Sequence, residues 1–276
     1  MSEIGKEIVT TATELAKVLP VKEAYEDLLQ PAARELGQGL MTIAQTVNIL
    51  LAPLKIMVMS YDLIMETVSS SLTEKLKRVP PERLITPSPI IAGPTLEALR
   101  FTGHEEDLRE LFVNLLASSM DSHTAPTAHP GFVEIIKQIT PDEAKVINYI
   151  ARCLSKGLPI PIVHIKAQSP SGAYHYVEKN VTTCGIDAGC VHADLIGSYL
   201  DNLSRLGLIN LLDTVYARKG AYDKIYHHPD YRELISSIED AYADREPPPK
   251  ILAQEASLEL SSFGHLFINA CLSREE

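Results

Sequence analysis

The sequence predicts a mainly α-helical protein, in which an N-terminal helical bundle is followed by a winged-helix-like α+β module. Apolar residues recur at three- and four-residue spacing in several segments of the first half, which is the pattern of helices with one buried face. The second half predicts helix, strand, helix, strand and strand, the order of elements in a winged helix. We therefore expect a bundle domain at residues 1–139 and a winged-helix-like domain at residues 140–276.

The first 65 residues allow two interpretations. Residues 1–35 predict a helix that Pro20 interrupts and that could form an N-terminal arm. The run from Leu36 to Leu54 carries no formal charge. Its polar residues favour a core helix of the bundle, because a membrane-spanning helix needs more uniform apolarity. The alternative is a membrane-perturbing hairpin formed by the apolar helices of Leu36–Met65, which would place polar side chains in lipid.

The best-patterned helix follows a proline-rich connection at residues 69–89 and a shorter helical segment that opens at Gly93-Pro94. Thr102 precedes Glu105 by three residues, the spacing of a capping box, in which both side chains bind backbone N–H groups at the helix start. An apolar stripe after it predicts one buried face. The stripe consists of Leu108, Leu111, Phe112, Leu115 and Leu116.

A second capping box, Thr140-Pro-Asp-Glu143, starts the predicted module, with proline at the first helical position. Its helix extends to Leu154 and is followed by a short edge strand from Pro159 and a polar loop. The remaining predicted elements are a helix over Asp187–Leu206, a strand from Gly207, a strand over Tyr222–His227, a strand over Ile251–Leu260, and a helix over Ser261–Leu272 capped by Ser261 or Ser262.

Three polar residues of one loop, Asp121, His123 and His129, are the candidates for acid–base catalysis. A capping role competes with this interpretation, because Asp121 can cap a turn and His129 precedes Pro130 at the start of the next predicted helix. No nucleophile accompanies the three residues in the sequence, which favours capping over catalysis.

A zinc site is the sharpest metal hypothesis that the sequence allows. Cys184, Cys190 and His192 could supply ligands, with His175 nearby, but their spacing differs from the usual CxxC pattern. Thiols without a metal are therefore favoured. The glycine-rich segments lack the context of a phosphate loop, so we expect no cofactor.

The charge balance bears on partners. The chain has a net charge of -11, and residues 140–276 hold 13 Lys and Arg against 18 Asp and Glu. The predicted recognition helix carries Asp194 and Asp201, which would repel phosphate, so nucleic acid is not the expected partner. A protein partner or a homo-oligomer is expected instead. Four cysteines and no signal peptide in the sequence predict a cytoplasmic protein, and the membrane-perturbing alternative would associate it with a membrane on activation.

Long ordered blocks resemble a known family. The run GPTLEALRFTGHEEDLRELFVNLLASSMD, followed by AHPGFVEIIKQITPDEAKV, is similar to the Abi-alpha (abortive infection alpha) family of bacterial proteins. The resemblance extends over most of the chain from about Leu28 and implies a role in defence against phage. With no catalytic constellation in the sequence, we expect a non-enzymatic interaction or sensing protein. The alternatives are the membrane-perturbing effector and a hydrolase-type enzyme with an unrecognised site.

Overall fold

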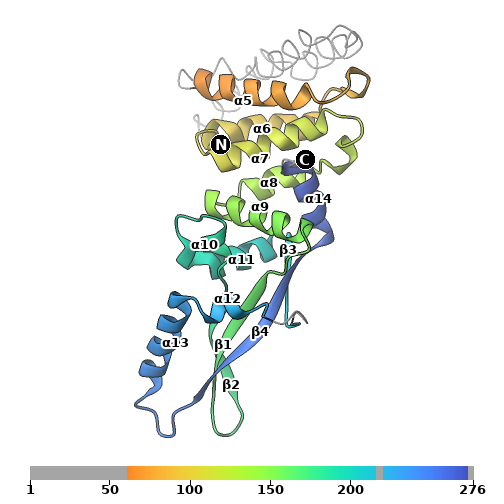
Figure 1. Cartoon of the computed structure of the whole chain (residues 1–276). Coiled ribbons are helices and arrows are strands. Elements are labelled where there is room, and N and C mark those ends of the chain that lie inside the picture. The colour runs from red at the N-terminus through yellow and green to blue at the C-terminus, as the bar shows by residue number, and fades with distance from the viewer. Residues whose placement is uncertain (1–60, 216–219, 273–276) are drawn as a thin grey trace, which may run out of the picture. The chain divides into compact units, whose positions relative to one another are not determined.

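The computed structural model describes residues 61–215 and 220–272 of the chain (Figure 1). By its internal contacts the chain divides into two compact units, Met1–Lys137 with Ala270–Glu276, and Gln138–Asn269. The predicted arm at 1–35 and most of the apolar segment Leu36–Met65 lie outside the described residues; only its last five residues are described, at the start of helix α5. Within the described ranges, no helix is both long enough and apolar enough to cross a membrane.

The described part of the first unit is helical. Helix α7 packs against α5, α6 and α8. Fully buried Leu72, Leu99, Phe112, Leu115 and Phe132 fill the space between these helices. The predicted central helix and its buried stripe are therefore confirmed. The helices are α5 (Tyr61–Leu76), α6 (Pro89–Thr102), α7 (Glu106–Ser119) and α8 (Gly131–Ile136), with 3₁₀ turns η3 (Pro81–Arg83) and η4 (Ala125–Thr127).

Two details of the predicted central region are wrong. Thr102 does not cap α7: it ends α6, where its hydroxyl donates to the carbonyl of Ala98, and the N-cap of α7 is Glu105, without a side-chain hydrogen bond. Helix α6 begins at Pro89, earlier than Gly93-Pro94, and so contains Pro94 in its interior. Proline at the first helical position loses no hydrogen bond, which makes Pro89 a favourable start.

The second unit combines helices with a four-stranded antiparallel sheet of order β2-β1-β4-β3. Strands β1 and β4 pair along their length, from Pro161 opposite Ser257 to Gln168 opposite Lys250. The elements are α9 (Pro141–Ser155), β1 (Pro161–Gln168), β2 (Tyr174–Val181), α10 (Cys184–Asp187), η5 (Ala193–Leu195), α11 (Ile196–Arg205), β3 (Ile209–Leu212), α12 (Asp223–Tyr226), α13 (Pro229–Tyr242), β4 (Lys250–Leu260) and α14 (Ser262–Cys271).

Local signals placed several of these elements correctly. The Thr140–Glu143 capping box is present, with the Glu143 carboxylate 2.6 Å from Thr140 N and the Thr140 hydroxyl 3.2 Å from Glu143 N. Helix α9 and strands β1, β3 and β4 confirm the predicted elements. Ser261 caps α14 by accepting a hydrogen bond from Gly264 N at 2.8 Å.

Three predictions for the second unit are wrong. The polar loop contains β2, an edge strand whose mostly exposed side chains conceal the alternation of a half-buried strand. The strand predicted at Tyr222–His227 is helix α12, because Tyr222 and Ile225 share one buried helical face. The helix predicted from Asp187 is broken: α10 ends at Asp187, and α11 begins at Ile196 after a separate turn.

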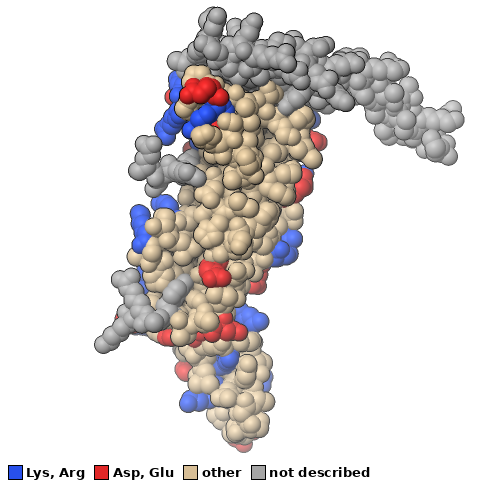
Figure 2. All heavy atoms as spheres, turned by 90° about the vertical axis from the view of Figure 1, so that its right-hand side faces the viewer, with Lys and Arg blue, Asp and Glu red and all other residues tan. Residues whose placement is uncertain are grey.

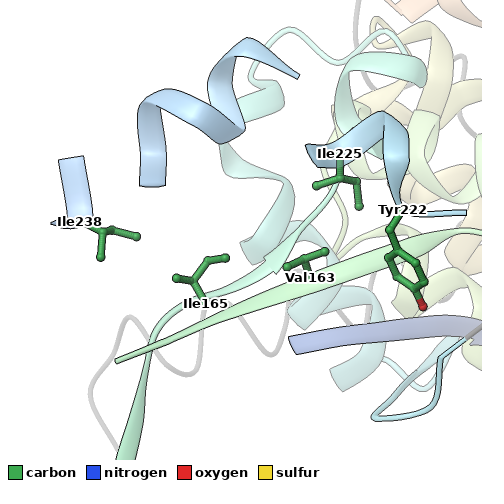
Figure 3. Close-up of a cluster of buried hydrophobic side chains, with 5 residues drawn as sticks. All are labelled: Val163, Ile165, Tyr222, Ile225 and Ile238. Carbon is green, nitrogen blue, oxygen red and sulfur yellow. The ribbon is translucent and has the colours of Figure 1, made fainter. Parts of the chain in front are cut away.

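One face of the sheet is covered by α12 and α13. Val163 and Ile165 of β1 point toward Tyr222, Ile225 and Ile238 of these helices and form a buried apolar cluster (Figure 3). Since side chains alternate along a strand, His164, Lys166 and Gln168 lie on the opposite face of the sheet.

Candidate functional site

A cleft of about 310 Å³ lies in the second unit, where three segments converge. The end of β2, the α10–α11 region and the start of α13 supply its walls. Its apolar lining includes Val181, Ile186, Ile196, Ile225 and Leu234, and its polar lining includes Glu178, Lys179, Asn180, Asp194, His228 and Asp230. A mostly apolar cleft with a few polar groups is the usual form of a binding site.

Exposed apolar side chains adjoin this cleft. Ile186, in its lining, is 46% exposed; Val191 and Leu195, in the same α10–α11 region, are 75% and 46% exposed. Single exposed apolar residues are ordinary, but three within ten positions of a segment that lines an apolar cleft suit a surface that a partner covers. We call Ile186, Val191 and Leu195 the apolar patch.

Asp142 holds the segment that carries Val191. Its buried carboxylate accepts hydrogen bonds from Val191 N at 3.0 Å, His192 N at 2.8 Å and the Tyr199 hydroxyl at 3.3 Å. Burial acts to raise the pKa of Asp142, but these backbone donors and Lys145 outweigh it, so the pKa lies below the ordinary value. Burial and the adjacent Asp142 raise the pKa of Tyr199 to about 12. The ionised carboxylate of Asp142, on α9, therefore holds the connection between α10 and α11 in place.

A second carboxylate fixes α10. Asp187 accepts hydrogen bonds from the hydroxyls of Thr183 and Tyr149 at 2.9 and 3.3 Å, and Lys224 of α12 forms an ion pair with it. Burial, assisted by Asp187 and by neighbouring thiols, raises the pKa of Tyr149, which keeps its hydroxyl a donor. Ile186 is thereby held on a helix that is tied to two neighbouring elements.

The floor of the cleft includes Asn180, which has a left-handed backbone with φ of 58°. Its N–H donates to Nδ1 of buried His164 at 3.1 Å, and its side-chain amide donates to Asp201 at 2.7 Å. Asparagine tolerates this backbone conformation better than most residues. The accepting Nδ1 of His164 carries no proton, so the ring is neutral in this arrangement.

This neutral histidine predicts a pH-dependent stability. Burial is the main cause that lowers the pKa of His164; Lys179 and Lys166 act in the same direction, and Asp213 and Asp201 oppose it. The unfolded chain binds the proton at a pH of about 6.5, whereas the folded chain binds it only at lower pH. The free energy of unfolding should therefore fall as the pH drops below about 6.5.

Urea unfolding at pH 7.5 and 5.5 checks this prediction. The pH-dependent loss should be smaller in His164→Gln than in the natural chain, because the variant lacks the titrating ring. The other histidines are common to both proteins, so the difference between them isolates His164. Equal losses in both proteins would contradict the prediction.

On the rim of the cleft, His228 has a structural role. Its Nδ1 accepts a hydrogen bond from Asp230 N at 3.3 Å, which makes it the N-cap of α13. Burial raises the pKa of Tyr231, whose ring packs edge-on against Tyr226 at 5.4 Å. These contacts hold His228 and Tyr231 in place in the lining of the cleft.

Sequence reasoning did not identify the cleft, since Asn180 lay in the predicted loop and α13 was not predicted. One signal for α13 was present: Tyr231, Leu234, Ile235 and Ile238 follow helical spacing, and the residues before them include a proline at the first helical position. The convergence of this helix with β2 has no local signature.

The three predicted catalytic residues lie in the first unit, where Asp121 and His129 have structural contacts. Asp121 forms an ion pair with Arg83 and accepts a hydrogen bond from His123 N at 3.0 Å. Burial acts to raise the pKa of Asp121, and the contacts with Arg83 and His123 lower it overall. His129 Nδ1 accepts from Gly131 N at 3.0 Å, and its ring lies 5.7 Å from that of Phe132. Asp121 and His129 thus each bind backbone at a turn.

The proposed metal ligands have other contacts in the structure. Cys184 is buried, and burial raises the pKa of its thiol. Cys190 Sγ lies 3.6 Å from the carbonyl of Asp142, whereas the His192 backbone binds the Asp142 carboxylate. His175 lies on β2 and pairs with Tyr242 at 2.8 Å. Across residues 61–215 and 220–272, no group of three or more His, Cys, Asp and Glu is arranged to hold a metal ion.

Charge is interspersed on the face shown in Figure 2. Its basic and acidic side chains occur in small groups of both signs, with uncharged surface between them. Any electrostatic recognition on this face would therefore have to be local.

Three comparisons relate the chain to known proteins. No curated protein matches the chain. One solved structure, an uncharacterized protein from the hydrocarbon-degrading marine bacterium Alcanivorax borkumensis SK2, aligns with a TM-score of 0.35 and 19% identity, covering 54% of this chain and 94% of that chain. The model of the family described as abortive infection alpha matches residues 60–271. The chain therefore belongs to the abortive infection alpha family.

Proposed function

We propose that this protein acts in abortive-infection-type defence of bacteria against phage as a non-enzymatic interaction protein, and that the cleft binds an apolar segment of a protein partner. Family membership supports the defence role, because the family is named for abortive infection. The observation that carries the interaction is the apolar patch beside an apolar-walled cleft. Covering such surface is the main favourable contribution to protein association.

The rim specifies the chemistry of the partner. Three acidic residues line the cleft, Glu178, Asp194 and Asp230, and Lys179 is the basic residue of its lining. Opposite charges at a rim favour association with the correct partner and disfavour like-charged competitors. The proposed occupant is therefore a short segment with an apolar side chain in the cleft and Lys or Arg beside it.

We also propose that the second unit is a winged-helix variant that serves protein interaction in the cytoplasm. The succession α9, β1, α10, α11, β3, β4 and the neighbouring order β1-β4-β3 support this relation. Strand β2 and helices α12 and α13 would then be additions, and all three contribute to the cleft or its support. On this proposal the additions create the binding site.

The first test combines phage challenge with a substitution in the apolar patch. Ile186→Asp should weaken partner binding by about tenfold or more, equivalent to about 1.4 kcal/mol, because the new carboxylate must lose its hydration on association. Cells that produce this variant should lose protection in plaque assays against a panel of phages. Because Ile186 is 46% exposed, the variant should stay folded, which circular dichroism checks.

Val215→Asp is the matched control, since Val215 is 58% exposed in the same unit and does not line the cleft. It should protect as the natural chain does. A photo-crosslinking amino acid at position 195 should form a covalent adduct during infection that Ile186→Asp abolishes. Full protection by a folded Ile186→Asp protein would contradict the cleft proposal, whereas absence of protection by the natural chain would contradict the defence role itself.

A further inference from the structure

The face of the sheet opposite α13 carries an ordered set of tyrosines and lysines. The strand register places Tyr174 of β2, Gln168 of β1 and Lys250 of β4 in one row across three strands. The neighbouring row contains Tyr176, Lys166 and Leu252. Residues directly opposite one another in antiparallel strands present their side chains on the same face. These rows place aromatic and basic groups side by side.

The lysines lie over the tyrosine rings. Lys166 Nζ is 4.1 Å from the ring centroid of Tyr174 and 5.0 Å from that of Tyr176. Lys179 Nζ is 4.6 Å from the Tyr176 centroid. A cation above an aromatic ring is held by the negative charge of the ring face, without neutralisation. The rings therefore hold the two ammonium groups on this face of the sheet.

No carboxylate within the described ranges forms an ion pair with Lys166, Lys179 or Lys250. Asp213, at the end of β3, accepts a hydrogen bond from Gln254 at 3.2 Å, and Gln254 in turn accepts from the Tyr176 hydroxyl at 3.2 Å. Tyr176 is thus fixed in orientation, while Tyr174 remains 53% exposed. The face combines fixed cations with one accessible ring.

We propose that this face binds single-stranded nucleic acid, with the phosphates against Lys166, Lys179 and Lys250 and a base stacked on Tyr174. Proteins that bind single strands without sequence preference combine a positively charged track with aromatic side chains that stack on bases. The net charge of the whole chain opposes general binding to nucleic acid, but the fields of distant carboxylates are screened beyond about 10 Å at moderate salt.

The proposed mode differs from duplex recognition by a helix. Asp201 lies on α11, and Asp194 lies in the turn just before it. The guanidinium of Arg205 is bound to Gln138 and Asn202. A helix in a major groove is positioned by cations that bind phosphates, and the single cation of α11, Arg205, is already bound within the protein. A single strand instead exposes base faces that a tyrosine can reach. The three residues of the apolar patch are not part of this site, but Lys179 also lines the cleft, so Lys166→Gln alone serves as the variant that changes this face without changing the cleft.

Fluorescence anisotropy of the full chain with labelled 20-nucleotide oligothymidylate and oligouridylate tests the proposal. We expect binding of at least one strand that weakens with salt. Replacing Lys166 and Lys179 together by glutamine should reduce the slope of log affinity against log salt by about 1.4, because each lysine on a single strand contributes about 0.7. The matched control is Lys77→Gln with Lys137→Gln, two lysines paired to nearby glutamates, which should leave the slope unchanged.

Tyr174 separates stacking from simple attraction of charge. Tyr174→Ala should weaken binding by about tenfold, the order expected for loss of one stacked base. Tyr174→Phe keeps an aromatic ring and should bind with the affinity of the natural chain. Unlabelled polyglutamate should compete poorly, since it offers negative charge without bases. Absence of binding to both strands would overturn the proposal, as would equal affinities of the natural chain and Tyr174→Ala, or competition by polyglutamate equal to that of the oligonucleotide.

Discussion

Replacing Gly264 with alanine is expected to destabilise the second unit by about 3 kcal/mol, the upper part of the usual range for overpacking. Gly264 lies in α14 directly against the Leu208 carbonyl, and a Cβ atom at this position would be 1.9 Å from the carbonyl oxygen. That contact is far inside van der Waals distance, so the backbone of one segment must move.

The surrounding hydrogen bonds oppose such a movement. The Leu208 carbonyl accepts from Ser261 N at 3.1 Å, and the Ser261 hydroxyl binds both Gly264 N and the carbonyl of Gly207. Shifting α14 to accommodate a methyl group would break the helix cap and its attachment to Leu208. Glycine is required at position 264 because the two backbones approach so closely that no side chain fits between them.

Urea unfolding followed by circular dichroism measures this effect, and hydrogen exchange assigns it to the second unit. Gly93→Ala is the control: Gly93 is exposed inside helix α6, with no atom within 4 Å of an added Cβ. Alanine favours helix over glycine, but a Cβ directly before Pro94 is disfavoured in the helical conformation, so that variant should change stability by less than about 1 kcal/mol. Unchanged stability of Gly264→Ala would show that the two segments are not held as closely as described.

Replacing Asp142 with alanine should lower the free energy of unfolding by about 3 kcal/mol, because the Val191 and His192 N–H groups and the hydroxyl of buried Tyr199 would lose their acceptor. Asp142→Asn keeps one carbonyl oxygen and should lose about half as much. Both variants should also weaken partner binding, since Val191 of the apolar patch is held by this carboxylate.

The contribution of Asp142 should depend on pH. Its folded-state pKa lies below the ordinary value, so the stabilisation is complete at neutral pH and is lost as the pH falls below about 3.9. Urea unfolding at pH 7 and at pH 3 should show a larger gap between the natural chain and Asp142→Ala at pH 7. Asp240→Ala, an exposed carboxylate on α13, should change stability by less than about 0.5 kcal/mol. A gap that persists undiminished at pH 3 would contradict this account.

Local sequence determined the elements whose signals involve neighbouring residues. The capping box at Thr140 and Glu143, the stripe of α7 and the cap of α14 by Ser261 each depend on groups within four residues or on one helix face. Family membership was likewise evident from continuous blocks of the sequence and is confirmed by the family model. Helical spacing correctly predicted the buried face of α7, whereas the same spacing in α13 did not lead to a predicted helix.

Tertiary structure decided the features that depend on distant residues. Thr102 and Glu105 have the same spacing as Thr140 and Glu143, yet Thr102 ends the preceding helix and binds Ala98, because a pattern of four residues does not specify which helix contains them. Strand β2 exists through its pairing with β1, since its own side chains show little alternation of burial. The cleft depends on the same cause: it forms where residues separated by about fifty positions meet, and only the packed sheet and helices bring them together.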